Sequence, residues 1–153
     1  VCTVVSKLFN IAMPAKAYFG LKDYQQYVIV KQMAKDLNFN IKVIGCPIVR
    51  EKSGIAMSSR NTYLSEKAKQ DACGIYKSLC LAKKQFSAGK KLNDIKKNIE
   101  KNILAIPTSK IDYVELRNSE NLDLATDKDK SIVIAVAVKV ANVRLIDNIV
   151  CKK

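Results

Sequence analysis

A regular alternation of helix and strand patterns at the start of the chain constrains the fold more than any other feature of this sequence. Apolar residues recur at helical spacing in residues 1–12 and again in residues 22–37. Short apolar runs at residues 17–19 and 41–44 are typical of strands, and Gly20 joins the first run to the second helix. A helix–strand–helix–strand order indicates a parallel sheet with crossover helices, so we expect an α/β fold.

A change of composition after Pro47 indicates a domain boundary. A polar loop over residues 50–61 contains a glycine and three serines, and no second half of the parallel sheet follows it. We therefore expect one domain over residues 1–48 and a second over residues 49–153. The second should be α+β with an antiparallel sheet, because two helical patterns precede a series of strand patterns. Its expected elements are a helix from the N-cap Ser65 to Gly89, a helix from Leu92 to before Pro107, and strands at 111–116, 132–140 and 144–148, the last two joined by a tight turn at Ala141 and Asn142.

Two of these elements carry patterns that predict which face is buried. The first helix should bury the stripe formed by Val1, Val4, Val5 and Leu8. The strand at residues 132–140 has large aliphatic residues on one face and Ala135 and Ala137 on the other. We expect a helix to pack on the alanine face, because small side chains allow a close approach.

The charge of the chain leaves two interpretations of its surface. There are 27 basic and 14 acidic residues, a formal net charge of +13, and nearly all of the basic residues are lysines. Such a surface suits a polyanionic partner such as nucleic acid or an anionic membrane. We favour an ordinary solvated surface, because the lysines are scattered and lack the aromatic partners or basic helix of a nucleic-acid reader. The longest apolar run, residues 132–138, is too short to span a bilayer.

The cysteine and histidine content excludes several kinds of chemistry. The five cysteines include no C-x-x-C pair, and there is no histidine, so a zinc site is not expected. Cys73 and Cys80 have helical spacing and should be small buried residues, which fits a reducing cytoplasm. Without histidine, no Ser-His or Cys-His nucleophile can form. Any chemistry must depend on charge and positioning, or on residues outside this chain.

A first candidate site lies where the strand at residues 17–19 meets the following helix. We call Gly20, Lys22, Asp23 and Gln26 the glycine–lysine turn. Ligands of open α/β sheets bind at this edge, and a helix N-terminus with a nearby lysine favours phosphate. Lys22 and Gln26 are four residues apart and share a helix face, so one could bind phosphate and the other a polar substrate. The alternative is that Asp23 only complements the helix dipole and the glutamine is a surface residue.

A second candidate site lies in the polar loop. We call Met57, Ser58, Ser59 and Arg60 the serine–arginine loop. Two hydroxyls followed by a guanidinium are suited to binding a triphosphate, because arginine can contact two phosphate oxygens at once. Such loops are often mobile lids. The alternative is an ordinary serine-rich linker.

Beyond these patterns, the chain closely resembles the pantothenate synthetase family, whose members are also called pantoate-beta-alanine ligases. The matching segments are KLFN at 7–10, AYFGLKDYQQ at 17–26, DLN at 36–38, PIVRE at 47–51 and GIAMSSRNTYL at 54–64, and then DYVE at 112–115, IAVA at 134–137 and RLIDN at 144–148. The resemblance therefore covers essentially the whole chain. It implies the second half of a Rossmann-like parallel-sheet domain followed by a small α+β domain that closes over the nucleotide.

The resemblance implies a two-step ligation. Pantoate is adenylated by ATP with loss of pyrophosphate, and beta-alanine then displaces AMP to give pantothenate. By similarity, Gly20 and Asp23 bind the ribose, Lys22 the phosphate that becomes the adenylate, Gln26 the pantoate, and the Val49 backbone the adenine. Mg²⁺ is required for the first step, and no residue of this chain is expected to ligate it. Its ligands should come from the nucleotide and from an N-terminal half.

The serine–arginine loop resembles the family's counterpart of the KMSKS loop, which neutralises the leaving pyrophosphate. The expected ATP-binding residues of the loop are Met57, Ser58, Ser59 and Arg60. The expected catalytic residues are Lys22, Ser58, Ser59 and Arg60. The absence of a general base is no objection, because an adenylation depends mostly on positioning and charge neutralisation.

The chain departs from the family pattern in one respect. Complete members carry an H-x-G-H motif ahead of the segment matched here, and this sequence begins at Val1 and has no histidine. We therefore expect a C-terminal portion that is inactive alone, from a cytoplasmic protein that is a homodimer at full length, with no nucleic acid or membrane partner. Two alternatives stay open: a related nucleotidyltransferase that uses another acid, against which Gln26 and the context of Gly20 speak, and a non-catalytic basic module that binds nucleotides or nucleic acid.

Overall fold

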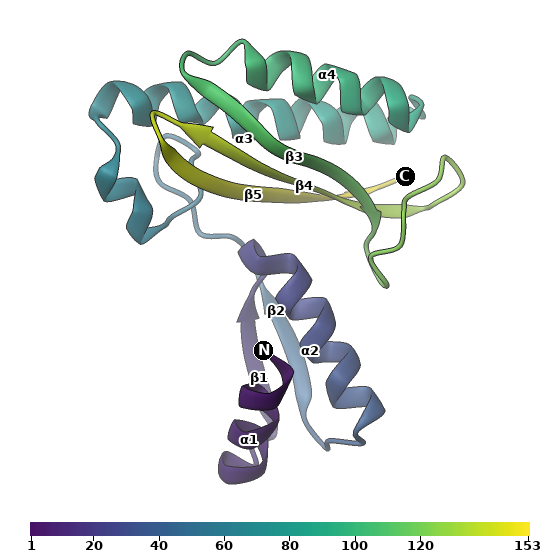
Figure 1. Ribbon diagram of the computed structural model, residues 1–153. Helices are drawn as coiled ribbons and strands as arrows, with labels where there is room; N and C mark the ends of the chain where they lie inside the picture. The colour runs from purple at the N-terminus through teal and green to yellow at the C-terminus, as the bar shows by residue number, and fades with distance from the viewer. The chain divides into compact units, whose positions relative to one another are not determined.

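The computed structural model describes all 153 residues, from Val1 to Lys153. The chain folds into two compact units, Val1–Ile48 and Val49–Lys153. The first unit contains a two-stranded parallel sheet, and the second contains a three-stranded antiparallel sheet (Figure 1). The predicted fold class, with parallel strands first and an α+β part after them, is confirmed.

The first unit has the predicted order of helix, strand, helix and strand. Its elements are α1 (Cys2–Ala12), β1 (Lys16–Gly20), the short 3₁₀ helix η1 (Leu21–Asp23), α2 (Tyr24–Asp36) and β2 (Lys42–Cys46). The two strands pair in parallel, so that Gly20 lies beside Cys46 at their carboxyl ends. A parallel pair needs a crossover connection, and α2 supplies it. All four predicted elements are therefore present.

The core of the first unit is small. Its fully buried members are Phe9 from α1 and Val30, Met33 and Ala34 from α2. Phe9 meets the ring of Phe39 edge to face, with 5.6 Å between the ring centroids. Partly buried residues of both strands pack against this group. A two-stranded sheet offers little area to cover, so a few side chains complete the core.

The buried face of α1 differs from the prediction. The side chains that face the core are Cys2, Val5 and Phe9. Val4 and Leu8, which were expected to be buried, are 63% and 57% exposed. The reason is that α1 is apolar around much of its circumference while the unit covers only one narrow stripe of it. Helical periodicity located the helix but did not select the stripe that is covered.

The second unit places two helices on one face of its sheet (Figure 1). Its elements are η2 (Ser59–Tyr63), α3 (Glu66–Ser87), α4 (Leu92–Leu104), β3 (Ser109–Asn118), β4 (Ser131–Val140) and β5 (Val143–Lys152). β4 is the central strand and pairs antiparallel with both neighbours. The helices begin and end where the sequence predicts. The hydroxyl of Ser65 accepts the N–H of Ala68 at 3.2 Å, and Gly89 follows α3 with a positive φ of 77°.

The large aliphatic face of β4 forms the core of this unit. Its buried residues are Ile132, Ile134, Val136, Val138 and Val140, which cluster with apolar residues of α3 and α4. The prediction that a helix packs on the face with Ala135 and Ala137 is therefore wrong. Branched side chains bury more apolar area against the helices than alanines can, and this gain outweighs the closer approach that small residues permit.

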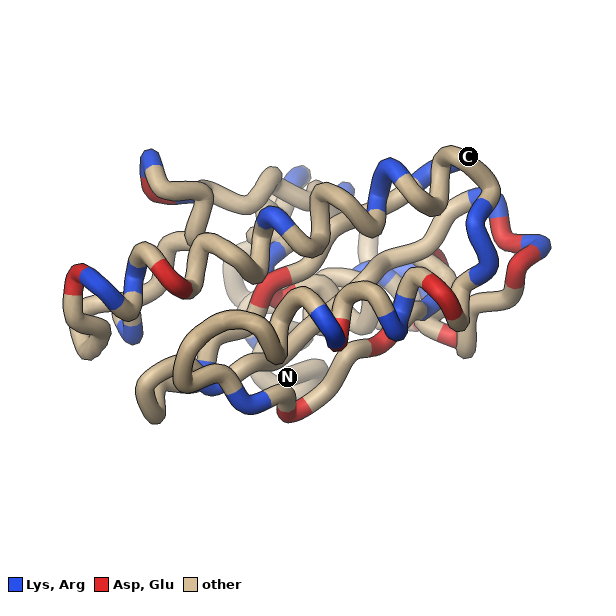
Figure 2. Tube along the Cα trace, turned by 90° about the horizontal axis from the view of Figure 1, so that it is seen from above, with Lys and Arg blue, Asp and Glu red and all other residues tan.

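Basic residues are spread along the chain rather than gathered into one segment. Figure 2 shows lysines and arginines on helices, strands and loops, with acidic residues among them. The interpretation favoured from the sequence, an ordinary solvated surface, stays a prediction. None of the helices is both long and apolar enough to cross a lipid bilayer.

The two cores differ in size, and this difference predicts unequal protection from hydrogen exchange. We expect amides of β1 and β2 to exchange at least about a hundredfold faster than amides of β4, because few buried side chains oppose opening of the first unit. Native-state hydrogen exchange followed by NMR measures both sets in one sample. Equal protection of the two sheets would show instead that the whole chain opens as a single cooperative unit.

The turn between β4 and β5 predicts a stabilising substitution. Ala141 and Asn142 both have positive φ, at 46° and 68°, which is the geometry of a tight hairpin turn and is unfavourable for alanine. Ala141→Gly should raise the free energy of unfolding by about 1 kcal/mol in urea denaturation, because it removes this strain.

Ala105 is the matched control for this substitution, because it is exposed and has an ordinary φ of −75° at the end of α4. Ala105→Gly should lower the free energy of unfolding by about 0.5 kcal/mol. If both glycine variants lose stability, the strain at Ala141 is not significant.

Candidate functional site

The glycine–lysine turn lies at the carboxyl edge of the parallel sheet in the first unit. β1 ends at Gly20, η1 contains Lys22 and Asp23, and the first turn of α2 contains Gln26. The paired ends of β1 and β2 and the N-terminus of α2 thus meet at one edge. The position is the one where open α/β sheets bind ligands.

The surroundings of Gly20 point to a ligand. Its backbone is extended, with φ −67° and ψ 129°, a conformation that any residue adopts. A Cβ added at this position would have no other atom of the chain within 4 Å. Neither backbone geometry nor packing within the chain therefore requires glycine here. Close approach of a ligand to the backbone is a remaining reason for a glycine.

The N-terminus of α2 is not capped by a side chain. Asp23 occupies the N-cap position but makes no side-chain hydrogen bond to the helix. The side chains of Asp23 and Gln26 are exposed, and that of Lys22 is half-buried. The positive end of the helix dipole at this exposed first turn favours an anion. The alternative interpretation, in which Asp23 only complements the helix dipole, requires no capping bond and stays open.

The serine–arginine loop belongs to the second unit and extends from a small hairpin. The N–H of Met57 donates to the carbonyl of Val49 at 3.0 Å, and the N–H of Glu51 donates to Ile55 at 2.9 Å. The hairpin turns at Gly54, whose φ of 94° favours glycine. This pairing leaves the N–H of Val49 outside the hydrogen bonds of the hairpin.

The loop presents its polar groups at the surface. Ser58 is the N-cap of η2, and its hydroxyl accepts the N–H of Arg60 at 3.2 Å. The side chains of Met57, Ser59 and Arg60 are exposed, and that of Ser58 is half-buried. A guanidinium, two hydroxyls and turn amides therefore lie within four consecutive residues. This set can bind phosphate oxygens through charge-assisted hydrogen bonds.

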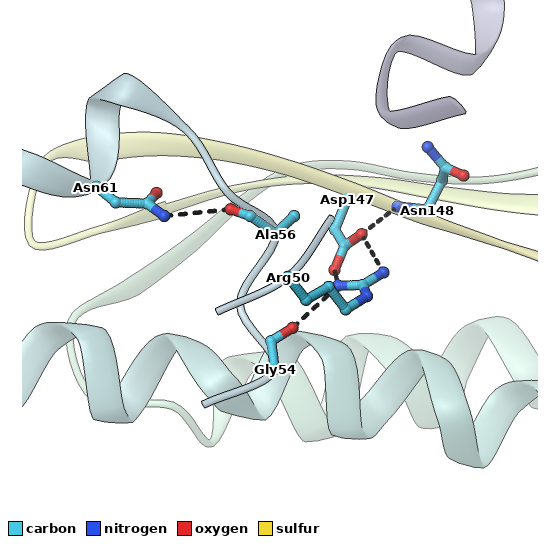
Figure 3. Close-up of polar contacts among 6 residues, drawn as sticks. All are labelled: Arg50, Gly54, Ala56, Asn61, Asp147 and Asn148. Carbon is cyan, nitrogen blue, oxygen red and sulfur yellow. Dashed lines mark hydrogen bonds and ion pairs between the residues drawn. The ribbon is translucent and has the colours of Figure 1, made fainter. Parts of the chain in front are cut away.

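The structure also shows an ion pair beneath the hairpin that the sequence analysis missed (Figure 3). Arg50 donates to both carboxylate oxygens of Asp147 on β5, at 2.7 and 2.9 Å, and to the carbonyl of Gly54 at 3.0 Å. Its guanidinium lies over the ring of Tyr76 on α3, 3.6 Å from the centroid. The one sequence signal for this pair was Asp147, an aspartate that lies between Leu145 and Ile149 on one face of a strand and would need a partner if buried.

The Arg50 guanidinium stays charged. Burial by itself lowers the pKa of the Arg50 guanidinium, but the hydrogen bonds and negative charge of Asp147 outweigh burial and raise that pKa above its ordinary value. Asp147 also accepts the N–H of Asn148 at 2.8 Å. The buried carboxylate of Asp147 therefore accepts hydrogen bonds from the Arg50 guanidinium and from the N–H of Asn148.

Other reactive groups of the chain offer no second site. No group of three or more histidine, cysteine, aspartate or glutamate side chains could hold a metal ion. All five cysteines are free, and burial raises the pKa of the Cys151 thiol to about 11. That thiol is therefore a weak nucleophile at neutral pH. The two loops remain as the candidate site, each within its own unit.

Comparison with known proteins identifies the family. A family profile described as pantoate-beta-alanine ligase matches residues 1–150. Pantothenate synthetase of Thermosipho africanus is 47% identical over 150 residues, which are 98% of this chain and 54% of that protein. The pantothenate synthetase of Clostridioides difficile is 50% identical over 150 residues, 97% of this chain and 53% of that protein. The chain thus spans about half the length of these relatives.

Solved structures agree with the sequence matches. Pantothenate synthetase from Thermus thermophilus has a TM-score of 0.88 and 36% identity, covering 97% of this chain and 54% of that one. Pantoate-beta-alanine ligase from Francisella tularensis, solved in complex with beta-gamma ATP and beta-alanine, has a TM-score of 0.64 and 34% identity, covering 97% and 48%. The resemblance seen in the sequence is confirmed along the chain, which belongs to the pantoate-beta-alanine ligase family.

Proposed function

We propose that the chain carries part of the ATP- and pantoate-binding surface of an AMP-forming pantoate-beta-alanine ligase. In the proposed reaction, a carboxylate oxygen of pantoate attacks the α-phosphorus of ATP and pyrophosphate leaves. The amine of beta-alanine then attacks the acyl carbon of pantoyl adenylate. AMP departs, the amine loses a proton, and the amide of pantothenate forms.

The observation that carries this proposal is the open space at Gly20 beside the uncapped N-terminus of α2. In the proposal, Gly20 lets the ribose approach the backbone and Asp23 accepts its hydroxyls. Lys22 neutralises the phosphate that becomes the adenylate, and Gln26 hydrogen-bonds pantoate. Support comes from the position of the turn at the carboxyl edge of a parallel sheet, where such ligands bind.

The second unit supplies the other proposed contacts. The N–H of Val49 binds the adenine, and Met57, Ser58, Ser59 and Arg60 bind the phosphates that leave as pyrophosphate. Support comes from the exposed guanidinium and hydroxyls of the loop. Binding of beta-gamma ATP and beta-alanine by the Francisella tularensis ligase supports the same assignment of ligands.

These residues suit an in-line displacement at phosphorus. Such a reaction needs the attacking and leaving oxygens placed opposite each other and the growing negative charge neutralised. Lys22 and Arg60 supply charge, and backbone N–H groups supply fixed dipoles. The chain has no histidine. The proposed first step needs none, because pantoate attacks as a carboxylate that is already ionised.

The residues of this chain do not fit a protein-held magnesium ion. No cluster of potential ligands is present. Magnesium commonly binds through nucleotide phosphates and water with one or two carboxylates, so we propose that it arrives with ATP. We assign no step of the reaction to a metal bound by this chain.

We further propose the roles of the units and the setting of the protein. The first unit is part of a Rossmann-like nucleotide-binding domain, and the second is a lid. The five free cysteines support a reducing cytoplasm, and the family resemblance supports a homodimer at full length. Small molecules are the proposed partners, without nucleic acid or membrane, because the basic residues are scattered along the chain with acidic residues among them (Figure 2).

Calorimetric titration with magnesium-ATP tests the proposed nucleotide site. The wild-type chain should bind saturably, and Lys22→Ala should weaken binding at least about tenfold, because a charge-assisted hydrogen bond to phosphate is lost. Lys35→Ala is the matched control. It removes the same charge from the last turn of α2, at the opposite end from Gly20.

The control separates the ligase from a basic module. Equal losses in the two lysine variants, with a steep dependence on salt, would support non-specific polyanion binding and contradict the proposal. Absence of saturable binding to the wild-type chain would contradict it as well. A loss confined to Lys22→Ala supports the glycine–lysine turn as the phosphate site.

Catalysis is a separate question from binding. We expect the 153-residue chain alone not to catalyse pantoate-dependent exchange between ATP and pyrophosphate, because it spans only about half the length of its relatives. Incorporation of labelled pyrophosphate into ATP measures this exchange. Exchange that depends on pantoate and is lost in Arg60→Ala would refute the expectation and show that the two units suffice for the first step.

A further inference from the structure

The buried ion pair links three parts of the second unit at one point. Arg50 comes from the first strand of the hairpin, Asp147 from β5 and Tyr76 from α3. The side chains of Arg50 and Asp147 are 16% and 6% exposed. A bidentate pair with a stacked ring fixes the orientation of the guanidinium as well as its position. The hairpin is thus attached to the rigid sheet and helix beneath it.

The attachment passes directly to the serine–arginine loop. Arg50 pairs with Ala56 across the hairpin. The N–H of the next residue, Met57, donates a hydrogen bond to the carbonyl of Val49 on the opposite strand. Arg50 also contacts the carbonyl of Gly54 at the turn. A shift of the guanidinium therefore moves both strands of the hairpin together. The attachment of the hairpin through Arg50 therefore also positions Met57, the first residue of the serine–arginine loop.

The other end of the loop is fixed by Asn61. This side chain is 3% exposed, and its amide donates to the carbonyl of Ala56 at 3.2 Å (Figure 3). The same amide nitrogen donates to the carboxylate of Glu51 at 2.6 Å. Both acceptors belong to the hairpin that Arg50 attaches. The four residues of the serine–arginine loop thus lie between two fixed points, while the side chains of Met57, Ser59 and Arg60 are exposed.

Stability alone is a poor explanation for this arrangement. A buried ion pair contributes little that well-packed apolar side chains could not supply. The apolar core of the unit is provided separately by β4, α3 and α4. What a bidentate, stacked pair does supply is a single defined geometry. Here that geometry belongs to the base of an exposed loop with phosphate-binding groups.

We propose that Arg50, through Asp147 and Tyr76, is a positioning residue that fixes the serine–arginine loop in the conformation that receives the phosphates of ATP. This inference rests on the proposed function for its ligand. It adds a residue that need not touch the nucleotide. Ordering the loop before binding reduces the entropy cost of the phosphate contacts.

The test uses the whole chain and the variants Arg50→Lys and Asp147→Asn. In each variant, hydrogen exchange at the amides of Met57 and Asn61 should rise at least about tenfold while exchange in β4 is unchanged. Affinity for magnesium-ATP and affinity for tripolyphosphate should each fall at least about fivefold, because both ligands make the phosphate contacts of the loop. A residue that only stabilised the fold would also raise exchange in β4.

The matched controls are Arg144→Lys and Asp112→Asn. Arg144 and Asp112 form a second arginine–aspartate pair in the same sheet, at 2.7 Å, but on the exposed surface. These variants should leave loop exchange and ATP affinity within about twofold of wild type, because exposed pairs contribute little. Equal effects of the two pairs overturn the proposal.

A further variant keeps the test decisive if charge changes prevent folding. Gly54→Ala keeps every charge, but its Cβ would lie 3.1 Å from Cδ1 of Tyr76 and displace the hairpin. It should reproduce the rise in loop exchange and the loss of affinity for ATP and tripolyphosphate. Unchanged loop exchange, or raised loop exchange with unchanged affinity for both ligands, overturns the proposal. If the wild-type chain binds no ATP, the proposed function fails, and loop exchange alone then decides whether Arg50 orders the loop.

Discussion

Burial of the aliphatic face of β4 against α3 and α4 is the interaction on which the second unit depends. Five branched side chains of one strand are fully enclosed by the two helices. Close packing of this kind resists small displacements, because each side chain is in contact with several others. The sheet and α3 therefore form a rigid support, and polar groups that project from them keep their positions relative to one another.

Asp147 and Tyr76 project from this support, and the hairpin is attached to both through Arg50. The position of the buried ion pair depends on the apolar core, and the position of the exposed loop depends on the ion pair. Each step uses a more directional interaction than the one before it. The proposed phosphate-binding role of the loop benefits from this order, because its donors must be placed while the loop stays in contact with water.

The sequence predicted the elements well, because their signals are local. Helical spacing, the cap at Ser65 and the glycine after α3 all act within a few residues, and the structure confirms them. The buried faces of α1 and β4 were predicted wrongly. Periodicity shows that a stripe is apolar, but the partner that covers the stripe is set by the tertiary arrangement.

The candidate site was predictable in a similar way. The two loops could be named from their residues and from the family resemblance, and the structure brings the members of each loop together within its unit. Arg50 and Asp147 could not be paired in advance, because they lie 97 residues apart and meet only through strand register and the position of the hairpin. Asn61 was missed for the same reason, since its acceptors come from a turn that no local pattern specifies.

The glycines of this chain divide by the constraint each one satisfies. At Gly74 a Cβ would meet Ile106 at 2.9 Å, and at Gly54 and Gly89 the backbone has positive φ, so these positions serve folding. Gly20 satisfies neither constraint. Substitutions there separate recognition from folding. A set of side chains of increasing size at position 20, each with its stability measured, would act as a ruler for the depth of the proposed ligand space.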